Sequence, residues 1–222
     1  MSYNFEATKD FNNSLSDINT LLDFAEKADI AQKDSNRILF LKLSIVSMVT
    51  KFQVYVEKVL GEFLFQIRIS KKKNKELPLH SRLNSMKLIS TKYSLSNQLT
   101  NPETYNEAKY KEVNDHVVVL NMHCDQDGAI CKEYCLNIKF PIGKTGANEL
   151  LSLFKQFEGK SNIFEAYTID IEKLNGILSI RHNIIHQDVN PSPLTEVLVK
   201  DYMSYIQSLA VCIDSYLHII PH

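Results

Sequence analysis

The sequence is short of the residues that an all-β chain needs. It holds six glycines and six prolines in 222 residues, few for a fold built from many tight turns. Its charges nearly balance, with 25 Lys and Arg against 26 Asp and Glu, which excludes a uniformly basic nucleic-acid-binding protein and leaves only a local basic patch. The length fits one domain with a sizeable core, and we expect a single domain over residues 1–222.

Export and membrane signals are also missing. The first residues, MSYNFEATKD, contain no basic region followed by an apolar run, so no signal peptide is predicted. Five charged side chains interrupt the longest apolar region, residues 38–67, and argue against a bilayer span: Lys42, Lys51, Glu57, Lys58 and Glu62. Without export the four cysteines are expected to be reduced thiols. The sequence therefore predicts a cytoplasmic protein that has no membrane partner.

Several catalytic and metal-binding motifs do not occur. Residues 143–146 lack the upstream glycine of a phosphate-binding Walker loop, and there is no Gly-x-Ser-x-Gly elbow. His123, Cys124, Cys131 and Cys135 cluster in the sequence but include no Cys-x-x-Cys pair. Half-buried small side chains are the better interpretation of that cluster. No cofactor is predicted.

Helical periodicity dominates what is present. Apolar residues recur every three or four positions from Phe11 to Ala25, and a much longer helix is predicted from Arg37 to about Ser70. That long helix is apolar over most of its circumference, so we expect it at the centre of a core or shared with a second subunit. Further helices are predicted over residues 82–99, 150–159, 168–189 with Thr168 as cap, and from Leu194 onward.

The periodicity changes between residues 114 and 142. Alternate residues from 117 to 122 fall into two sets that a strand would place on opposite faces, and Asp127-Gly128 is a strong hairpin turn signal. Residues 131–140 could supply a return strand. The sequence therefore predicts a small β-hairpin, residues 114–142, inserted into a mainly α fold.

Positive charge is concentrated in one region. Residues 68–92 contain eight basic side chains and one acid, Glu76. Like-charge runs are most often solvated loops. The functional alternative is an RNA-binding patch whose contribution to affinity falls with salt. The side chains that would form it are Lys71, Lys72, Lys73 and Lys75.

Polar side chains gather near the C-terminus, in residues 179–188, at the end of an otherwise apolar helix. One interpretation is a helix end whose basic groups complement the helix dipole. His182 and His186 lie four residues apart and could also bind a metal from one helix face. The third ligand would have to be Glu172 or Asp188, and no Glu lies between the histidines as in His-Glu-x-x-His. We therefore expect no metal site here.

The segment from Arg181 to His186, RHNIIH, resembles the signature of HEPN domains. In that signature a His follows an Arg after four to six residues, usually with a polar residue directly after the Arg. The setting is similar, since the motif ends a late helix and a long amphipathic helix closes the domain. The chain looks closest to stand-alone HEPN nucleases of the RiboL-PSP-related group. The resemblance implies a HEPN-like antiparallel helical bundle that carries the predicted hairpin as an insertion.

The resemblance also implies a homodimer whose two motifs form one composite site for metal-independent endoribonuclease action. Attack of the ribose 2′-oxygen on the adjacent phosphorus needs a proton acceptor, a proton donor and positive charge on the phosphorane oxygens. Arg181 would stabilise that charge, and His186 would be the general base or acid. His182 and Asn183 would support them. The expected products carry a 2′,3′-cyclic phosphate and a 5′-hydroxyl.

The family setting further suggests a biological role and partners. It points to a toxin or an anti-phage defence effector that acts on RNA and is restrained by an antitoxin or another regulatory protein. The alternative is a non-catalytic HEPN-like module for dimerisation or for nucleotide or RNA binding. In that case Arg181 and His186 would hold an interface or a nucleotide.

Overall fold

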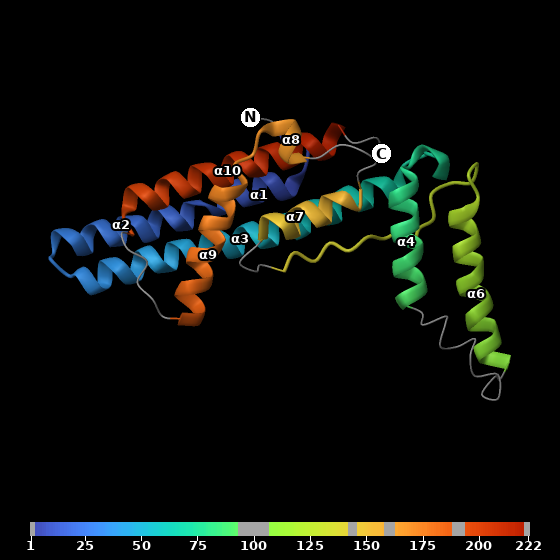
Figure 1. Cartoon of the computed structure of the whole chain (residues 1–222), viewed down its shortest axis with the longest axis horizontal. Helices are drawn as coiled ribbons and strands as arrows, with labels where there is room; N and C mark the ends of the chain where they lie inside the picture. The colour runs from blue at the N-terminus through green and yellow to red at the C-terminus, as the bar shows by residue number, and fades with distance from the viewer. Residues whose placement is uncertain (1–2, 93–106, 142–145, 158–162, 188–193, 220–222) are drawn as a thin grey trace.

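The computed structural model describes residues 3–92, 107–141, 146–157, 163–187 and 194–219. Within these ranges the chain is mostly helical and contains no extended strand, so the mainly α prediction is confirmed (Figure 1). A one-turn helix, η1 (Asn74–Glu76), joins two of the longer helices. The α-helices are α1 (Glu6–Ser14), α2 (Ser16–Ile30), α3 (Asp34–Ile69), α4 (Leu79–Lys92), α6 (Glu107–Cys124), α7 (Gly146–Lys155), α8 (Ile163–Tyr167), α9 (Ile171–Gln187) and α10 (Glu196–Ile219).

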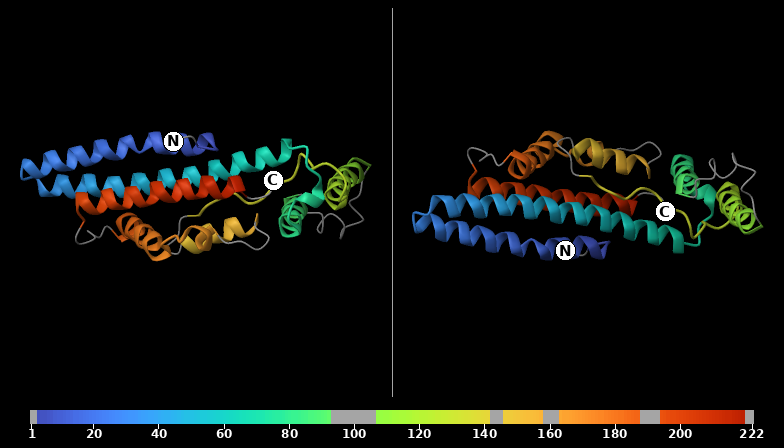
Figure 2. Two further views of the ribbon diagram at one scale, coloured as in Figure 1. Left: turned by 90° about the horizontal axis from the view of Figure 1, so that it is seen from above. Right: turned by 90° about the horizontal axis from the view of Figure 1, so that it is seen from below.

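Helix α3 is the axis of a long helical bundle (Figures 1 and 2). It packs against α1 and α2, against α10, and against α9. Its Ile45, Val49 and Phe52 are fully buried in the core. By length and composition alone α3 could also cross a membrane, with a mean hydropathy of 1.4 over its best window. In this structure its buried side chains form the centre of the bundle.

Some helices begin or end at other residues than the sequence predicted. The periodic face from Phe11 to Ala25 belongs to two helices that meet at Leu15, and the long helix begins three residues before Arg37. The predicted helix over residues 82–99 is α4, which starts earlier at Leu79. Residues 93–99 lie outside the described part of the chain.

Helix α1 is capped by side chains from distant helices. Its N-cap residue, Phe5, contributes no side-chain acceptor. The buried carboxylate of Asp214, in α10, accepts the backbone N–H groups of Asn4 and Phe5, each at 3.1 Å. Glu62, in α3, accepts the N–H of Ala7 at 3.0 Å. Carboxylates at this end satisfy free amides and complement the helix dipole, so α1, α3 and α10 are fastened together.

A buried tyrosine joins the same three helices further along. Tyr55 of α3 donates its hydroxyl to the carbonyl oxygen of Ala210 at 2.7 Å and accepts the hydroxyl of Thr8 at 3.3 Å. Burial raises the pKa of Tyr55, which therefore stays a neutral phenol. Each buried polar group in this contact has a partner, as a core requires.

The predicted β-hairpin over residues 114–142 is wrong. Residues 107–124 form α6, which packs on α4. We call this pair of helices the arm, because it projects from the C-terminal end of α3 (Figures 1 and 2). Residues 125–141 form no extended strand and run back from α6 along α3 toward α7.

Helical spacing explains why this segment is not a strand. Val113, His116 and His123 recur at three- and seven-residue intervals and are buried on one side of α6. Val117 and Val118, which suggested alternation, are instead both exposed. Two of the buried positions of α6 hold histidine, which is not an apolar residue. The apolar residues of α6 therefore do not show the helical period in the sequence.

The Asp127-Gly128 turn does form, but its partner is the segment around η1. The side chain of Asn74 is buried and donates to the carbonyl oxygens of Met122 and Asp125 at 2.7 and 2.8 Å, which caps the C-terminus of α6. The Lys75 ammonium lies 2.7 Å from a carboxylate oxygen of Asp127. The root of the arm is therefore fixed to α3 by a side-chain cap and an ion pair.

We expect Asp214→Ala to lower the free energy of unfolding by about 3 kcal/mol, because it leaves buried amides without a charged acceptor. Urea unfolding followed by circular dichroism measures this loss. Asp10→Ala, which removes an exposed carboxylate from α1, is the matched control and should change little. Equal midpoints for the two variants would contradict the capping role.

A second prediction concerns the thiols. Burial, followed by a hydrogen bond from its thiol to Glu133 at 2.7 Å, raises the pKa of Cys131 to about 11. The thiolate is therefore scarce at neutral pH, and Cys131 should react slowly with iodoacetamide while the exposed Cys124 reacts fast. Mass spectrometry of the native protein over a time course reports both rates. Comparable rates in folded protein would contradict this assignment.

Candidate functional site

Helix α9 carries the RHNIIH segment and lies across α3 rather than along it (Figure 1). Its Leu174, Ile177 and Leu178 are fully buried. At the start of α7, a Cβ on Gly146 would meet Cδ1 of Leu178. The missing Cβ lets Leu178 pack against the start of α7, so α7 and α9 are in close contact here.

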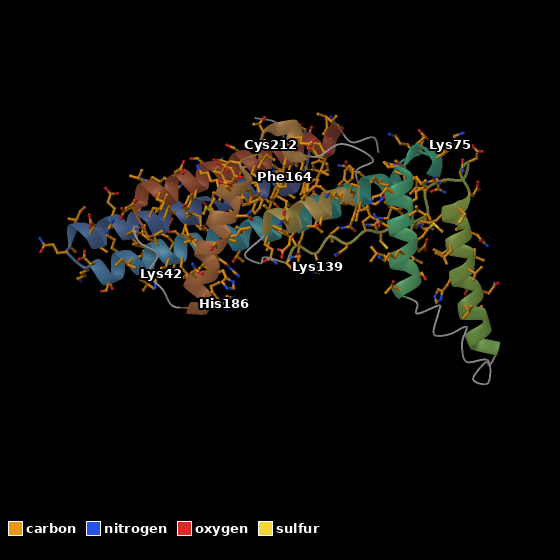
Figure 3. All side chains as sticks on the ribbon, viewed as in Figure 1. Lys42, Lys75, Lys139, Phe164, His186 and Cys212 are labelled. Atoms are coloured by element: carbon orange, nitrogen blue, oxygen red, sulfur yellow. The ribbon has the colours of Figure 1, made fainter. Side chains whose placement is uncertain are left out.

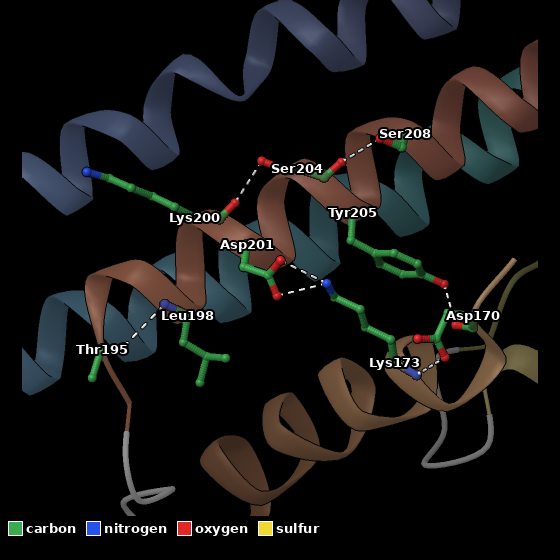
Figure 4. A network of polar contacts seen from close by, with 9 residues as sticks. All are labelled: Asp170, Lys173, Thr195, Leu198, Lys200, Asp201, Ser204, Tyr205 and Ser208. Carbon is green, nitrogen blue, oxygen red and sulfur yellow. Dashed lines mark hydrogen bonds and ion pairs between the residues drawn. The ribbon is translucent and has the colours of Figure 1, made fainter.

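Polar contacts fasten the first turns of α9 to α10 (Figure 4). The Lys173 ammonium lies 2.8 Å from a carboxylate oxygen of Asp201 and 5.3 Å from the centre of the Tyr205 ring. The Tyr205 hydroxyl donates to the carbonyl oxygen of Asp170 at 2.6 Å. Burial raises the pKa of Tyr205, so it remains a donor.

The cap of α9 differs from the sequence-based prediction. Asp170, not Thr168, accepts a backbone N–H in the first turn, that of Lys173 at 2.9 Å. Thr168 has a positive φ of 51° and ends the turn before the helix. An N-cap needs an extended backbone conformation, so Thr168 is in the wrong conformation to cap α9.

Arg181 lies on the side of α9 that packs on the bundle. It follows Leu174 by seven residues and Leu178 by three, which is the spacing of one helix face. Its Nε is buried and has no hydrogen-bond partner among the described residues. A buried guanidinium N–H without an acceptor is unfavourable. A phosphate or carboxylate oxygen is the acceptor that would suit it.

The two histidines form a pair on another side of α9. His182 and His186 lie one turn apart, with ring centroids 4.5 Å from each other and ring planes at 46°. His186 is exposed and His182 is half-buried. Contact with the tilted His182 ring restricts the orientation of the His186 ring, so His182 is placed to position it.

In a single copy of α9, the side chains of Arg181 and His186 leave the helix in different directions. Residues five apart differ by about 140° around an α-helix. Asn183, which is half-buried, lies about 160° from Arg181 by the same geometry. One copy therefore presents a guanidinium on one side and the imidazole pair on another.

The metal interpretation of His182 and His186 finds no third ligand in the described chain. Glu172 lies ten residues before His182, which is about 15 Å along the helix axis. Asp188 lies outside the described residues. No group of three or more His, Cys, Asp or Glu side chains that could hold a metal ion is found in the part of the chain that the structure covers.

The basic segment lies far from the motif. Figure 3 shows Lys75 beside the arm and His186 near the end of α9, on the opposite side of the view. Lys75 and Lys73 both approach Asp127, at 2.7 and 3.7 Å. Lys71 is exposed and Lys72 half-buried. The structure thus does not bring the two predicted functional regions together.

Two hollows in the described surface also lie away from the motif. One, of about 220 Å³, is lined by residues of α1 and α3, among them Phe11 and Val54. The other, of about 250 Å³, lies between α7 and the segment that ends at Pro141. Neither is lined by α9. Neither of these two hollows therefore adjoins Arg181 or His186.

Sequence reasoning missed the residues that position α9. Lys173, Asp201 and Tyr205 were not singled out, because their contacts join helices that are distant in the sequence. The one local signal was Asp170, an acid at the expected helix start. These residues fix the crossing helix and hence the direction in which His186 points.

Comparison with known families gives one result. The family model described as RiboL-PSP-HEPN matches residues 9–218, which include every α-helix from α2 to α9 and the whole RHNIIH segment. No curated protein and no solved structure matches the chain. HEPN domains are generally associated with ribonucleases. Since the matched region covers nearly the full sequence, the chain belongs to the RiboL-PSP-HEPN family of HEPN domains.

Proposed function

We propose that this protein is a metal-independent endoribonuclease that works as a homodimer. The observation that carries the proposal is the end of α9, where the ring of exposed His186 contacts that of His182 and the buried Nε of Arg181 lacks an acceptor among the described residues. Imidazole and guanidinium are the groups that RNA cleavage by the 2′-oxygen requires. Family membership supports the same chemistry.

In this mechanism a histidine takes the proton of the ribose 2′-hydroxyl as its oxygen attacks the adjacent phosphorus. The bond from phosphorus to the 5′-oxygen then breaks, and a second histidine protonates the leaving oxygen. Arg181 donates hydrogen bonds to the equatorial oxygens as negative charge builds up. The products carry a 2′,3′-cyclic phosphate and a 5′-hydroxyl. His186 is the base or acid, and His182 and Asn183 position it or the phosphate.

Two copies are needed because each supplies only one His186. The offset of about 140° between Arg181 and His186 also favours a site in which the guanidinium of one copy meets the imidazole of the other. Exposed apolar side chains on α3 and α9 provide an interface: Leu39, Leu43, Val54 and Ile185. The sequence-based view of α3 as a helix shared with a second subunit agrees with this proposal.

The proposed setting is a cytoplasmic toxin or anti-phage defence effector whose substrate is RNA. An unrestrained ribonuclease would harm its own cell, so an antitoxin or other regulatory protein is part of the proposal. No cofactor and no membrane take part in it.

The second candidate is a non-catalytic module that dimerises or binds nucleotide or RNA through the same residues. The distance of Lys71 and Lys72 from the motif is the observation that favours it, since a binding surface need not adjoin a reactive centre. Activity in the presence of a chelator separates the two candidates.

We expect purified protein to cleave RNA in EDTA and to lose activity by a factor on the order of 10²–10⁴ in Arg181→Ala and in His186→Ala. Gel analysis of end-labelled RNA measures the rate, and cyclic-phosphate ends identify the chemistry. His218→Ala, which changes an exposed histidine at the end of α10, is the matched control. Undiminished cleavage in both motif variants would refute the site, and cleavage only with added metal would favour the metal interpretation.

The basic segment gives a separate prediction. If Lys71 and Lys72 contact RNA phosphates, the double variant Lys71→Gln/Lys72→Gln should reduce the slope of log affinity against log salt by about 1.4 for single-stranded RNA. Lys73→Gln/Lys75→Gln should change the slope less, because Asp127 already pairs with both ammonium groups. Filter binding at several salt concentrations measures both slopes. If neither variant alters the slope, the segment is a solvated loop.

A further inference from the structure

The arm buries several polar side chains and exposes several apolar ones. In α4 the buried positions hold Ser81, Ser85 and Ile89, whereas Leu79 and Leu83 are 61% and 53% exposed. In α6 the buried positions include two histidines, while Val117, Val118 and Met122 are exposed. Ile89 and Val113 are buried too, but a pair of helices in water is expected to bury leucines and valines in preference to serines and histidines. The exposed apolar surface therefore indicates a partner.

Hydrogen bonds prevent the arm from turning its leucines inward. The Ser85 hydroxyl lies 3.2 Å from Nε2 of His123 and accepts the backbone N–H of Cys135 at 3.0 Å. Nδ1 of His123 lies 2.9 Å from the carbonyl oxygen of Val119. Ser81 is hydrogen bonded to the hydroxyl of Tyr134. Rotating α4 to bury its leucines would leave these buried polar groups unpaired, and that cost offsets the gain from burying two leucines.

We call the side of α4 that carries Leu79 and Leu83 the leucine face, and the end of the bundle where α2 joins α3 the α2–α3 end. We propose that the leucine face packs on the α2–α3 end of a second copy of this chain, a contact that we call the clasp. This inference rests on the proposed homodimer and names a part of its interface that the RHNIIH motif does not supply. The occupant is argued from symmetry and from charge.

Symmetry brings the two surfaces together. The α2–α3 turn and the arm lie at opposite ends of α3, which is about 54 Å long at 1.5 Å per residue. Helix α9 crosses α3 between them and projects on the same side as the arm (Figures 1 and 2). When two copies meet at α9 about a two-fold axis perpendicular to α3, their α3 helices run antiparallel. Each arm then faces the α2–α3 end of the other copy.

The leucine face of α4 points toward the position that the second copy would occupy. Leu79 and Leu83 lie one helical turn apart, on the side of α4 opposite Ser81, Ser85 and their contact with α6. In Figure 1, α6 stands on the side of α4 that is remote from α9. The opposite side of α4 therefore looks back along the bundle toward the position of the second copy.

Charge and apolar exposure are complementary between the two ends. Residues 16–36 hold five acids and two lysines, and residues 68–92 hold eight basic residues and one acid. Within one copy Asp17 and Asp29 already pair with Lys51 and Arg37, and Asp127 pairs with two of the lysines, so the remaining charges of the two ends carry the complementarity. The α2–α3 end exposes Ile30, at 78%, and Phe24. An acidic surface with apolar side chains at its centre matches a cationic helix that presents leucines. Phosphate groups of RNA would match the cations but not the leucines.

The direct test is a crosslink between residues that one copy cannot join. Ile30→Cys/Leu83→Cys is made in a Cys124→Ser background, which removes the exposed native thiol. A short bismaleimide should convert this variant to covalent dimers on a denaturing gel. The control, Leu83→Cys/Ile219→Cys, carries an equally exposed thiol at the C-terminal end of α10 and should give only the background yield. Equal yields in the two variants would overturn the clasp.

A second measurement needs no cysteine. Leu83→Glu should raise the dimer Kd roughly tenfold or more, the scale expected when a buried leucine becomes a charge, and Glu26→Lys should raise it too. Light scattering across a dilution series reports the Kd, and circular dichroism checks folding. Leu79 and Leu83 are already exposed, so the fold should persist.

The outcomes separate the clasp from the function proposed above. A wild-type protein that stays monomeric refutes the homodimer and the clasp together. A wild-type dimer with an unchanged Kd in Leu83→Glu refutes the clasp alone. Crosslinked ladders longer than a dimer would show a head-to-tail chain in place of the closed pair. Lost RNA binding with an unchanged dimer Kd would make the arm an RNA surface and likewise overturn the inference.

Discussion

Helix α3 has apolar side chains on more sides than one neighbouring helix can cover, and the rest of the bundle is arranged by that constraint. α1 and α2 cover one side, α10 a second, and α9 a third. Tyr55 and the carboxylates of Glu62 and Asp214 then lock this layering, because they pair buried polar groups across three helices. Leu39, Leu43 and Val54 of α3 stay exposed, and the proposed homodimer would use that surface.

The crossing of α9 over α3 determines where the side chains of the candidate site lie. A helix parallel to α3 would bury its last turns, whereas a crossing helix places them at the edge of the bundle. Arg181 lies where the core face of α9 reaches that edge, so its Nε is buried but unpaired. His186 lies on another side, free to meet solvent or a partner. The Lys173–Asp201 ion pair holds the angle from which both positions follow.

The two helices of the arm are joined differently from the helices of the bundle. Hydrogen bonds among Ser85, His123 and Cys135 join the helices of the arm beside a few buried apolar side chains such as Ile89 and Val113. Asn74 and Asp127 fix its root to the end of α3. Because polar side chains occupy buried positions of the arm, several of its apolar side chains are exposed. In the proposed dimer a second copy would cover the exposed leucines of α4.

The sequence by itself determined the helical class, the extent of α3 within a few residues and the family resemblance through RHNIIH, because all three depend on local spacing. It misassigned residues 114–142, since His116 and His123 occupy core positions and local alternation resembled a strand. Only the tertiary structure decided that Asp170 caps α9, that Lys73 and Lys75 pair with Asp127, and that the basic segment lies far from His186. Those outcomes depend on which distant helices meet, and contact between distant segments leaves no period in the sequence.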